Sequence, residues 1–156
     1  MLSENVIDFL QSMGGSMLCT RSADNQPAAC EMLWAEVAPH HVIGMVPAHL
    51  GAHLPVHFAD NTDVSVVTSQ TYGDHRSVQV KGTIADLEGP RVFDRSDVGE
   101  WFLNTVKFFP QFPPEDVARV LIDIVGCPVF RITIEVSDVF DQTPGPKAGA
   151  SIGAST

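Results

Sequence analysis

Short runs of alternating apolar and polar residues recur along the chain and predict a mainly β domain. The clearest run is residues 77–87, where Val78, Val80 and Ile84 fall on one face of a strand. A second run, residues 63–69, is rich in β-branched residues. Further strands are expected at residues 15–21, 28–37, 41–46 and 129–136. Because short turns separate most of these runs, we expect neighbouring strands to pair antiparallel.

Apolar residues spaced by three and four positions predict helices between the strands. A first helix follows Ser3, which can cap it, and two glycines end it. The segment 47–61 also has a helical pattern, but Pro55 lies inside it. Since proline is tolerated in the first turn of a helix, this helix should begin near His53. Two more helices are expected at residues 97–109 and 114–125.

The length and the order of elements indicate one domain followed by a tail. The chain has 156 residues, a usual size for a single domain, and neither a repeat nor a linker interrupts residues 1–142. Residues 143–156 are rich in Gly, Pro, Ala and Ser and are expected to be irregular. Three strands in succession, with helices between the later ones, favour an antiparallel barrel with peripheral helices, which is an α+β arrangement.

The charge balance excludes two classes of partner. The chain has nine Lys and Arg residues against 19 Asp and Glu, a formal net charge of −10. Nucleic acids and anionic membrane surfaces require clustered cations, and the cations here are scattered, so neither partner is expected. Charged residues are only 18% of the chain, below the usual ~25%. This shortage indicates extra buried surface, most simply a homodimer interface.

The N-terminal segment and the cysteines indicate a cytoplasmic protein without a metal site. The first ten residues lack the basic region and the long apolar core of a signal peptide. Apolar runs are far shorter than the ~20 residues that a membrane span needs. Cys19, Cys30 and Cys127 are widely spaced and odd in number, so neither a zinc site nor a disulfide framework is predicted.

Several short motifs accompany this order of elements. They are Asn25–Gln26–Pro27 before the second strand, the short helix after the third, Asp-Asn-Thr-Asp-Val at residues 60–64, and Arg-Ser-Val-Gln-Val-Lys-Gly at residues 76–82. In this order, from about residue 12 to residue 136, they resemble the FMN-binding split-barrel family typified by pyridoxamine 5'-phosphate oxidase. The resemblance implies an antiparallel split β-barrel and a homodimer that binds two FMN molecules at its interface.

The resemblance also implies where the FMN phosphate would lie. In that family the phosphate is held by an arginine on the second strand and by an Arg-Lys pair before the short helix. These positions fall here on Cys30 and on His53–Leu54. A phosphate dianion favours charge-assisted donors. We therefore expect His53 and Arg76 to face the phosphate, and Lys81 and Arg21 are further cationic candidates.

The rest of the cofactor would contact apolar and polar strand residues. The polar residue that meets the flavin after the fifth-strand arginine corresponds to Ser77. Apolar residues of the second and third strands would provide the flat wall that an isoalloxazine ring needs. The residues expected at the ring or the ribityl chain are Met32, Leu33, Met45 and Ser77.

Two functions are consistent with the resemblance. The first is an FMN-dependent oxidoreductase with a small-molecule substrate, in which the flavin carries the redox chemistry and no catalytic side chain is predicted. The second is a non-enzymatic protein that holds haem, another ligand or none. His49, His53 and His57 recur at intervals of four, a spacing that suits a metal or haem on a continuous helix. Because Pro55 disrupts such a helix, a solvated, structural set of histidines is the other interpretation.

Overall fold

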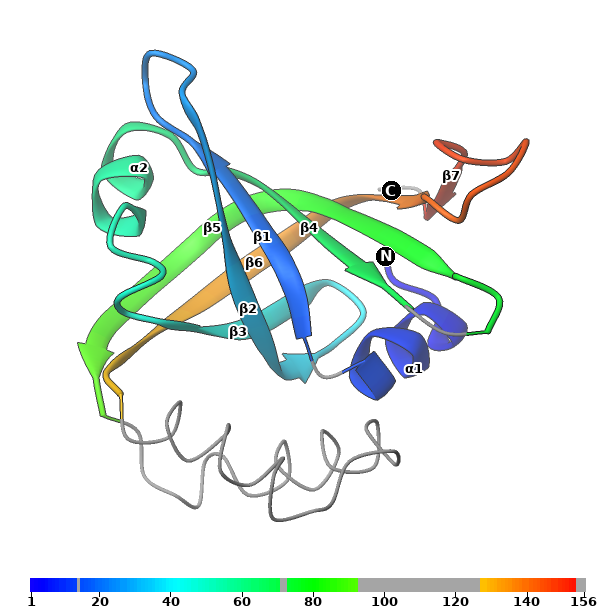
Figure 1. The fold of residues 1–156 in the computed structure, drawn as a ribbon, viewed down its shortest axis with the longest axis horizontal. Coiled ribbons are helices and arrows are strands. Elements are labelled where there is room, and N and C mark those ends of the chain that lie inside the picture. The colour runs from blue at the N-terminus through cyan, green and yellow to red at the C-terminus, as the bar shows by residue number, and fades with distance from the viewer. Residues whose placement is uncertain (14, 71–72, 93–126, 154–156) are drawn as a thin grey trace.

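In the part of the chain that it describes, the computed structural model shows an antiparallel β-barrel flanked by two helices (Figure 1). It describes residues 1–13, 15–70, 73–92 and 127–153. The helices expected at residues 97–109 and 114–125 lie outside the described residues. Within the described ranges, neither helix is long and apolar enough to cross a membrane.

Most elements of the first half begin and end where the sequence pattern predicts. These elements are α1 (Glu4–Met13), β1 (Gly15–Arg21), β2 (Pro27–Val37), β3 (His41–Pro47), α2 (Leu54–Asp60) and β4 (Asp63–Ser69). Helix α2 confirms the predicted start, since His53 is its N-cap residue and proline lies in its first turn. Helix α1 turns one apolar face, which includes Phe9 and Leu10, toward the barrel.

The last strands are longer than predicted. They are β5 (Ser77–Arg91), β6 (Val129–Asp141) and β7 (Ser151–Gly153). The strand expected at residues 77–87 does not end at Leu87, because β5 continues until Arg91 pairs with Val129 of β6. The short β7 lies in the segment expected to be irregular, and Gly153 pairs there with Val139 of β6. In both places the strand depends on a partner distant in sequence, which local alternation does not reveal.

The strands close into a barrel in the order β3-β2-β1-β4-β5-β6, because β6 also pairs with β3. Every pairing is antiparallel, and β7 adds to the end of β6. This architecture confirms the predicted mainly β, antiparallel split barrel. Gly82 allows β5 to approach β6 closely, since a Cβ atom there would lie 1.9 Å from the backbone oxygen of Glu135.

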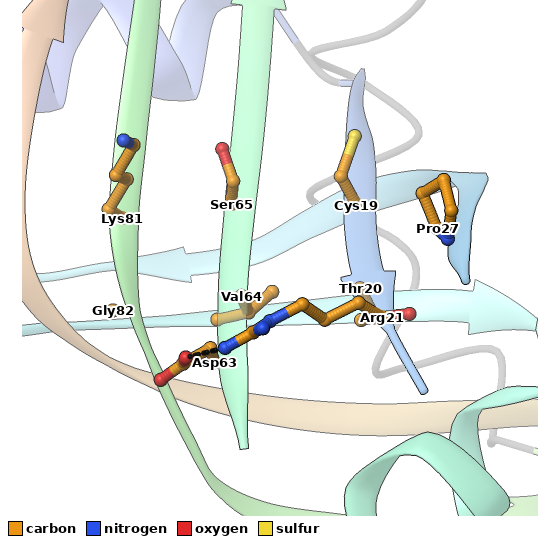
Figure 2. A pocket seen from close by; sticks show the side chains of 9 residues that line it. All are labelled: Cys19, Thr20, Arg21, Pro27, Asp63, Val64, Ser65, Lys81 and Gly82. Carbon is orange, nitrogen blue, oxygen red and sulfur yellow. Dashed lines mark hydrogen bonds and ion pairs between the residues drawn. The ribbon is translucent and has the colours of Figure 1, made fainter. Parts of the chain in front are cut away.

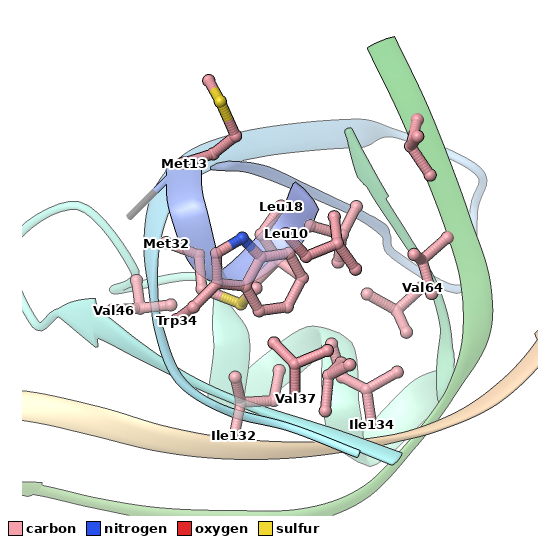
Figure 3. Packing of buried hydrophobic residues seen from close by; sticks show 14 of the residues in the cluster. Leu10, Met13, Leu18, Met32, Trp34, Val37, Val46, Val64, Ile132 and Ile134 are labelled. Carbon is pink, nitrogen blue, oxygen red and sulfur yellow. The ribbon is translucent and has the colours of Figure 1, made fainter. Parts of the chain in front are cut away.

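Apolar side chains, most of them aliphatic, fill the barrel interior (Figure 3), and α1 packs its apolar face against them. Fully buried members of this core include Leu10, Leu18, Met32, Ile132 and Ile134. On β5, Val78, Val80 and Ile84 are all buried in the core, as the alternation predicts. The alternate residues Gln79, Lys81 and Thr83 face outward. The outer face of the sheet is therefore where polar side chains can gather.

Candidate functional site

A pocket of about 410 Å³ is formed by neighbouring residues of β1, β4 and β5. Cys19 is the cross-strand partner of Ser65, and Ser65 is the partner of Lys81, so these side chains point to the same side of the sheet (Figure 2). The other lining residues are Thr20, Arg21, Pro27, Asp63, Val64 and Gly82. The volume is within the ~300–1,000 Å³ range typical of small-molecule sites.

Two cations and one carboxylate line this pocket. The Arg21 guanidinium donates to Asp63 Oδ2 at 2.8 Å and to the side-chain oxygen of Asn25. A guanidinium has five N–H donors, so this arginine can bind further acceptors. Lys81 Nζ lies 5.0 Å from the centroid of the Phe140 ring and forms no ion pair with another described residue. The pocket is thus locally cationic on a strongly acidic chain.

A chain of amide hydrogen bonds orients the hydroxyl of Ser65. Gln142 Nε2 donates to Gln79 Oε1 at 2.9 Å, and Gln79 Nε2 donates to Ser65 Oγ at 2.7 Å. Because Ser65 Oγ accepts in this bond, its own hydrogen can be donated to a group in the pocket. Ser65 therefore adds a third donor, from β4, to those of Arg21 on β1 and Lys81 on β5.

The thiol in the pocket is not activated. Burial raises the pKa of Cys19. The neighbouring Cys30 lies in the core, where burial, with a smaller contribution from Cys19, raises its pKa to about 11. Reactive cysteines require the thiolate, which both environments disfavour. The pocket therefore suits binding rather than covalent catalysis through cysteine.

Thr20 connects the pocket to helix α2. Its Oγ1 is hydrogen-bonded to Nδ1 of buried His57 at 2.9 Å. The ring of His53 lies edge-on to that of His57, with the ring centroids 5.0 Å apart. Burial, and then the nearby charge of His57, lowers the pKa of His53. His49 precedes α2, so the three histidines do not share one helix face, and no group of three or more potential ligands in the described chain is placed to hold a metal.

The structure places the first four predicted cofactor residues in separate environments. Met32 is buried in the core, where its side chain packs against Gly44. Leu33 and Met45 are cross-strand partners on β2 and β3. Both are buried but lie outside the core cluster, on the opposite face of these strands. His53 is half-buried at the start of α2.

The other two predicted residues, Arg76 and Ser77, lie together at the start of β5. Arg76 stacks on the Phe9 ring at 4.4 Å and donates to the side chain of Asn5 in α1. Ser77 N donates to Thr143 Oγ1 at 3.1 Å. None of the six predicted residues lines the pocket. Their role in holding a cofactor stays a prediction.

Sequence reasoning found part of the pocket and missed the rest. Arg21 and Lys81 were expected as possible phosphate donors, and the structure brings them to the same pocket. Ser65 was missed, because its orientation depends on Gln79 and Gln142, which are 63 positions apart. Its place on the outward side of a regular strand was the only signal in the sequence.

No protein-family model and no curated protein sequence matches the chain. Solved structures share its fold. One is a Clostridium acetobutylicum protein related to general stress protein 26 of B. subtilis (pyridoxinephosphate oxidase family), with a TM-score of 0.58 and 11% identity over 97% of each chain. Group A Streptococcus HupZ has a TM-score of 0.56 and 15% identity over 96% of this chain and 100% of its own.

An F420 reductase is also similar, with a TM-score of 0.54 and 15% identity over 88% of this chain and 98% of its own. Proteins described as putative pyridoxamine 5'-phosphate oxidases from Listeria innocua and Lactobacillus delbrueckii are similar as well. At such low identities the likeness concerns the fold. The chain therefore has the split-barrel fold of pyridoxamine 5'-phosphate oxidase-like proteins.

Proposed function

We propose that the protein is a cytoplasmic oxidoreductase that binds a flavin-type cofactor, with FMN the preferred form, and acts on a small-molecule substrate. The observation that carries this proposal is the fold, which is shared with an F420 reductase and with a protein of the pyridoxinephosphate oxidase family. The bound flavin would supply the redox chemistry, and the chain would bind it, orient it and limit its access to water.

The outer face of β2 and β3 fits the ring of such a cofactor. Leu33 and Met45 lie side by side there, as buried apolar side chains outside the core cluster. His53, at the start of α2, has a buried Nε2 atom without a hydrogen-bond partner among the described residues, and we expect it to give the cofactor a polar contact. An apolar wall with a few polar groups is the usual lining of a cofactor site.

A homodimer is part of the proposal. The low share of charged residues, 18%, leaves more apolar surface than a small monomer needs. Met17, on the outward side of β1, is 46% exposed, and Ile152 on β7 is 40% exposed. Exposed apolar side chains of this kind are typical of surfaces that a second copy covers. Light scattering coupled to size-exclusion chromatography should give twice the mass of one chain.

The test of the proposed function is the absorption spectrum of the purified protein, followed by titration with FMN and with a deazaflavin. We expect a yellow protein, or saturable quenching of FMN fluorescence at one site per chain. Met45→Ala should weaken flavin binding by removing apolar contact. The matched variant Met13→Ala, which also truncates a buried methionine but lies at the end of α1, should not.

A colourless protein that binds neither flavin would overturn the proposed function. A Soret band on addition of haem, without flavin binding, would favour the non-enzymatic haem-binding alternative. Circular dichroism of both methionine variants would establish that any loss of binding does not come from unfolding, because Met45 is buried.

A further inference from the structure

We propose that the pocket between β1, β4 and β5 binds the phosphate group of a phosphate monoester through Arg21, Lys81 and Ser65. Phosphate binding stands on the pocket alone. The identification of the monoester as the phosphate end of FMN rests on the proposed function. The sequence resemblance places the phosphate at Cys30 and His53–Leu54, which lie outside this pocket. Arg21 and Lys81 were expected only as further cationic candidates, and Ser65 was not expected.

The donors that line the pocket have unused hydrogen-bonding capacity. The described contacts of Arg21 use two of the five guanidinium N–H groups. Lys81 is exposed, and its ammonium contacts only the face of Phe140 within the described chain. Ser65 accepts from Gln79 and keeps its own hydrogen for donation. Three residues with available donors, on three adjacent strands, thus line one pocket of about 410 Å³.

The number and charge of these donors fit phosphate better than a carboxylate. A phosphate monoester has about −1.5 to −2 charges at pH 7 and three strong acceptor oxygens. A carboxylate has one charge and two oxygens. Two cations and one hydroxyl therefore match the monoester in both charge and acceptor number. The lining contains no aromatic residue, so the flat part of a flavin would have to lie beyond this pocket.

Asp63 is expected to weaken phosphate binding, whereas Arg21 and Lys81 are expected to strengthen it. Its carboxylate is the ion-pair partner of Arg21 at 2.8 Å, and both side chains are exposed. This pair directs the guanidinium from β1 across to β4 (Figure 2). The same carboxylate repels an incoming phosphate and competes with it for Arg21. Removal of a cation should therefore weaken binding, whereas removal of this anion should strengthen it.

The experiment is a titration of the whole protein with inorganic phosphate, followed by ³¹P NMR, and with FMN and riboflavin, followed by flavin fluorescence. Lys81→Gln should weaken phosphate and FMN binding about tenfold, the effect of one lost charge-assisted hydrogen bond. It should leave riboflavin binding unchanged. Asp63→Asn should tighten phosphate binding. Lys147→Gln makes the same change in net charge on the exposed tail and should have no effect.

The outcomes separate this inference from the proposed function. Phosphate binding that weakens in Lys81→Gln, without binding of either flavin, would support the pocket and overturn the flavin proposal. Equal binding of FMN and riboflavin, unchanged in Lys81→Gln, would support the flavin proposal and overturn the phosphate site. The phosphate site would also be overturned if phosphate binding were not saturable, or if Lys81→Gln and Lys147→Gln weakened phosphate binding equally. Because Lys81 is exposed, its variant should fold normally.

Discussion

One cation, Arg76, immediately precedes β5 and another, Lys81, lies within it, and the two have different surroundings. Arg76 is stacked on Phe9 and bonded to Asn5, so its charge holds α1 against the barrel. Lys81 projects from the middle of the strand into the pocket, where its ammonium contacts only the Phe140 ring among the described residues. The contacts of a cation, rather than its place in a motif, indicate whether it serves the fold or a ligand.

The polar groups around Arg76 also satisfy one another. The hydroxyl of Thr143, then its backbone N–H, lowers the pKa of Asp141 by hydrogen bonding, and the charges of Arg76 and Lys147 add to this. The same threonine accepts from the backbone N–H of Ser77. Donors and acceptors at the start of β5 are thus paired within the chain. The pocket retains unused donors, so substitutions in the two places should have different effects.

The largest effect is expected when the wall of the pocket is disturbed. In Gly82→Ala the new Cβ atom would meet the backbone oxygen of Glu135 at 1.9 Å, and a backbone atom cannot turn aside as a flexible side chain can. We expect a loss of about 3 kcal/mol in the free energy of unfolding, the upper end of the usual cost of overpacking. Urea unfolding measures this loss.

Gly15→Ala is the matched control for that variant. Gly15 also lies in a barrel strand, but its nearest neighbours would be 3.9 Å from an added Cβ atom, an ordinary contact distance. It should therefore lose little or no stability. Equal losses in the two variants would mean that the β5–β6 approach at Gly82 does not constrain the pocket wall.

A smaller loss, with no effect on ligands, is expected at the start of β5. Arg76→Met removes the charge above Phe9 and the hydrogen bond to Asn5, which together should cost about 1–2 kcal/mol of stability. Arg76→Lys keeps a cation near the ring and should lose less. Neither variant should change phosphate binding. Weaker phosphate binding with unchanged stability would instead place Arg76 at the phosphate, where the sequence analysis expects it in place of the family's usual cations.

The sequence predicted the fold better than the site, and particular residues explain why. Strands β1 and β4 follow local alternation and were predicted with their correct bounds. The start of α2 followed from the chemistry of Pro55. The extension of β5 and the orientation of Ser65 depend on β6 and on Gln142, both distant along the chain. Local periodicity contains no information on such pairings.

The smallest effect is expected on the pH dependence of stability, at the helix that adjoins the pocket. Burial, and then His57, lowers the pKa of His53 from its ordinary value of 6.5. Below about pH 6.5 the unfolded chain therefore binds more protons at this residue than the folded chain does. The contribution of His53 to the free energy of unfolding should therefore decrease as the pH falls from 6.5 toward the lowered pKa. Above pH 6.5 this contribution should be constant.

Urea unfolding at several pH values between about 5 and 7.5, on either side of the ordinary histidine pKa, measures this dependence. The whole chain also loses negative charge on acidification, which relieves repulsion and acts in the opposite direction. The informative quantity is therefore the difference in slope between the unmodified protein and a variant. His53→Gln should remove the acid-side decrease, and His40→Gln, at an exposed position, should not.

Thr20 connects helix α2 to the pocket that Lys81 lines. Thr20 lines the pocket and is hydrogen-bonded to His57, which contacts His53. Protonation of His53 at acid pH should therefore disturb the packing of α2 and, through Thr20, the pocket. Phosphate binding to the unmodified protein should then weaken more steeply below pH 6.5 than the change in phosphate charge explains, and His53→Gln should remove the excess. Equal pH profiles in the two proteins would mean that α2 and the pocket titrate independently, and that only the cations on β1 and β5 control binding.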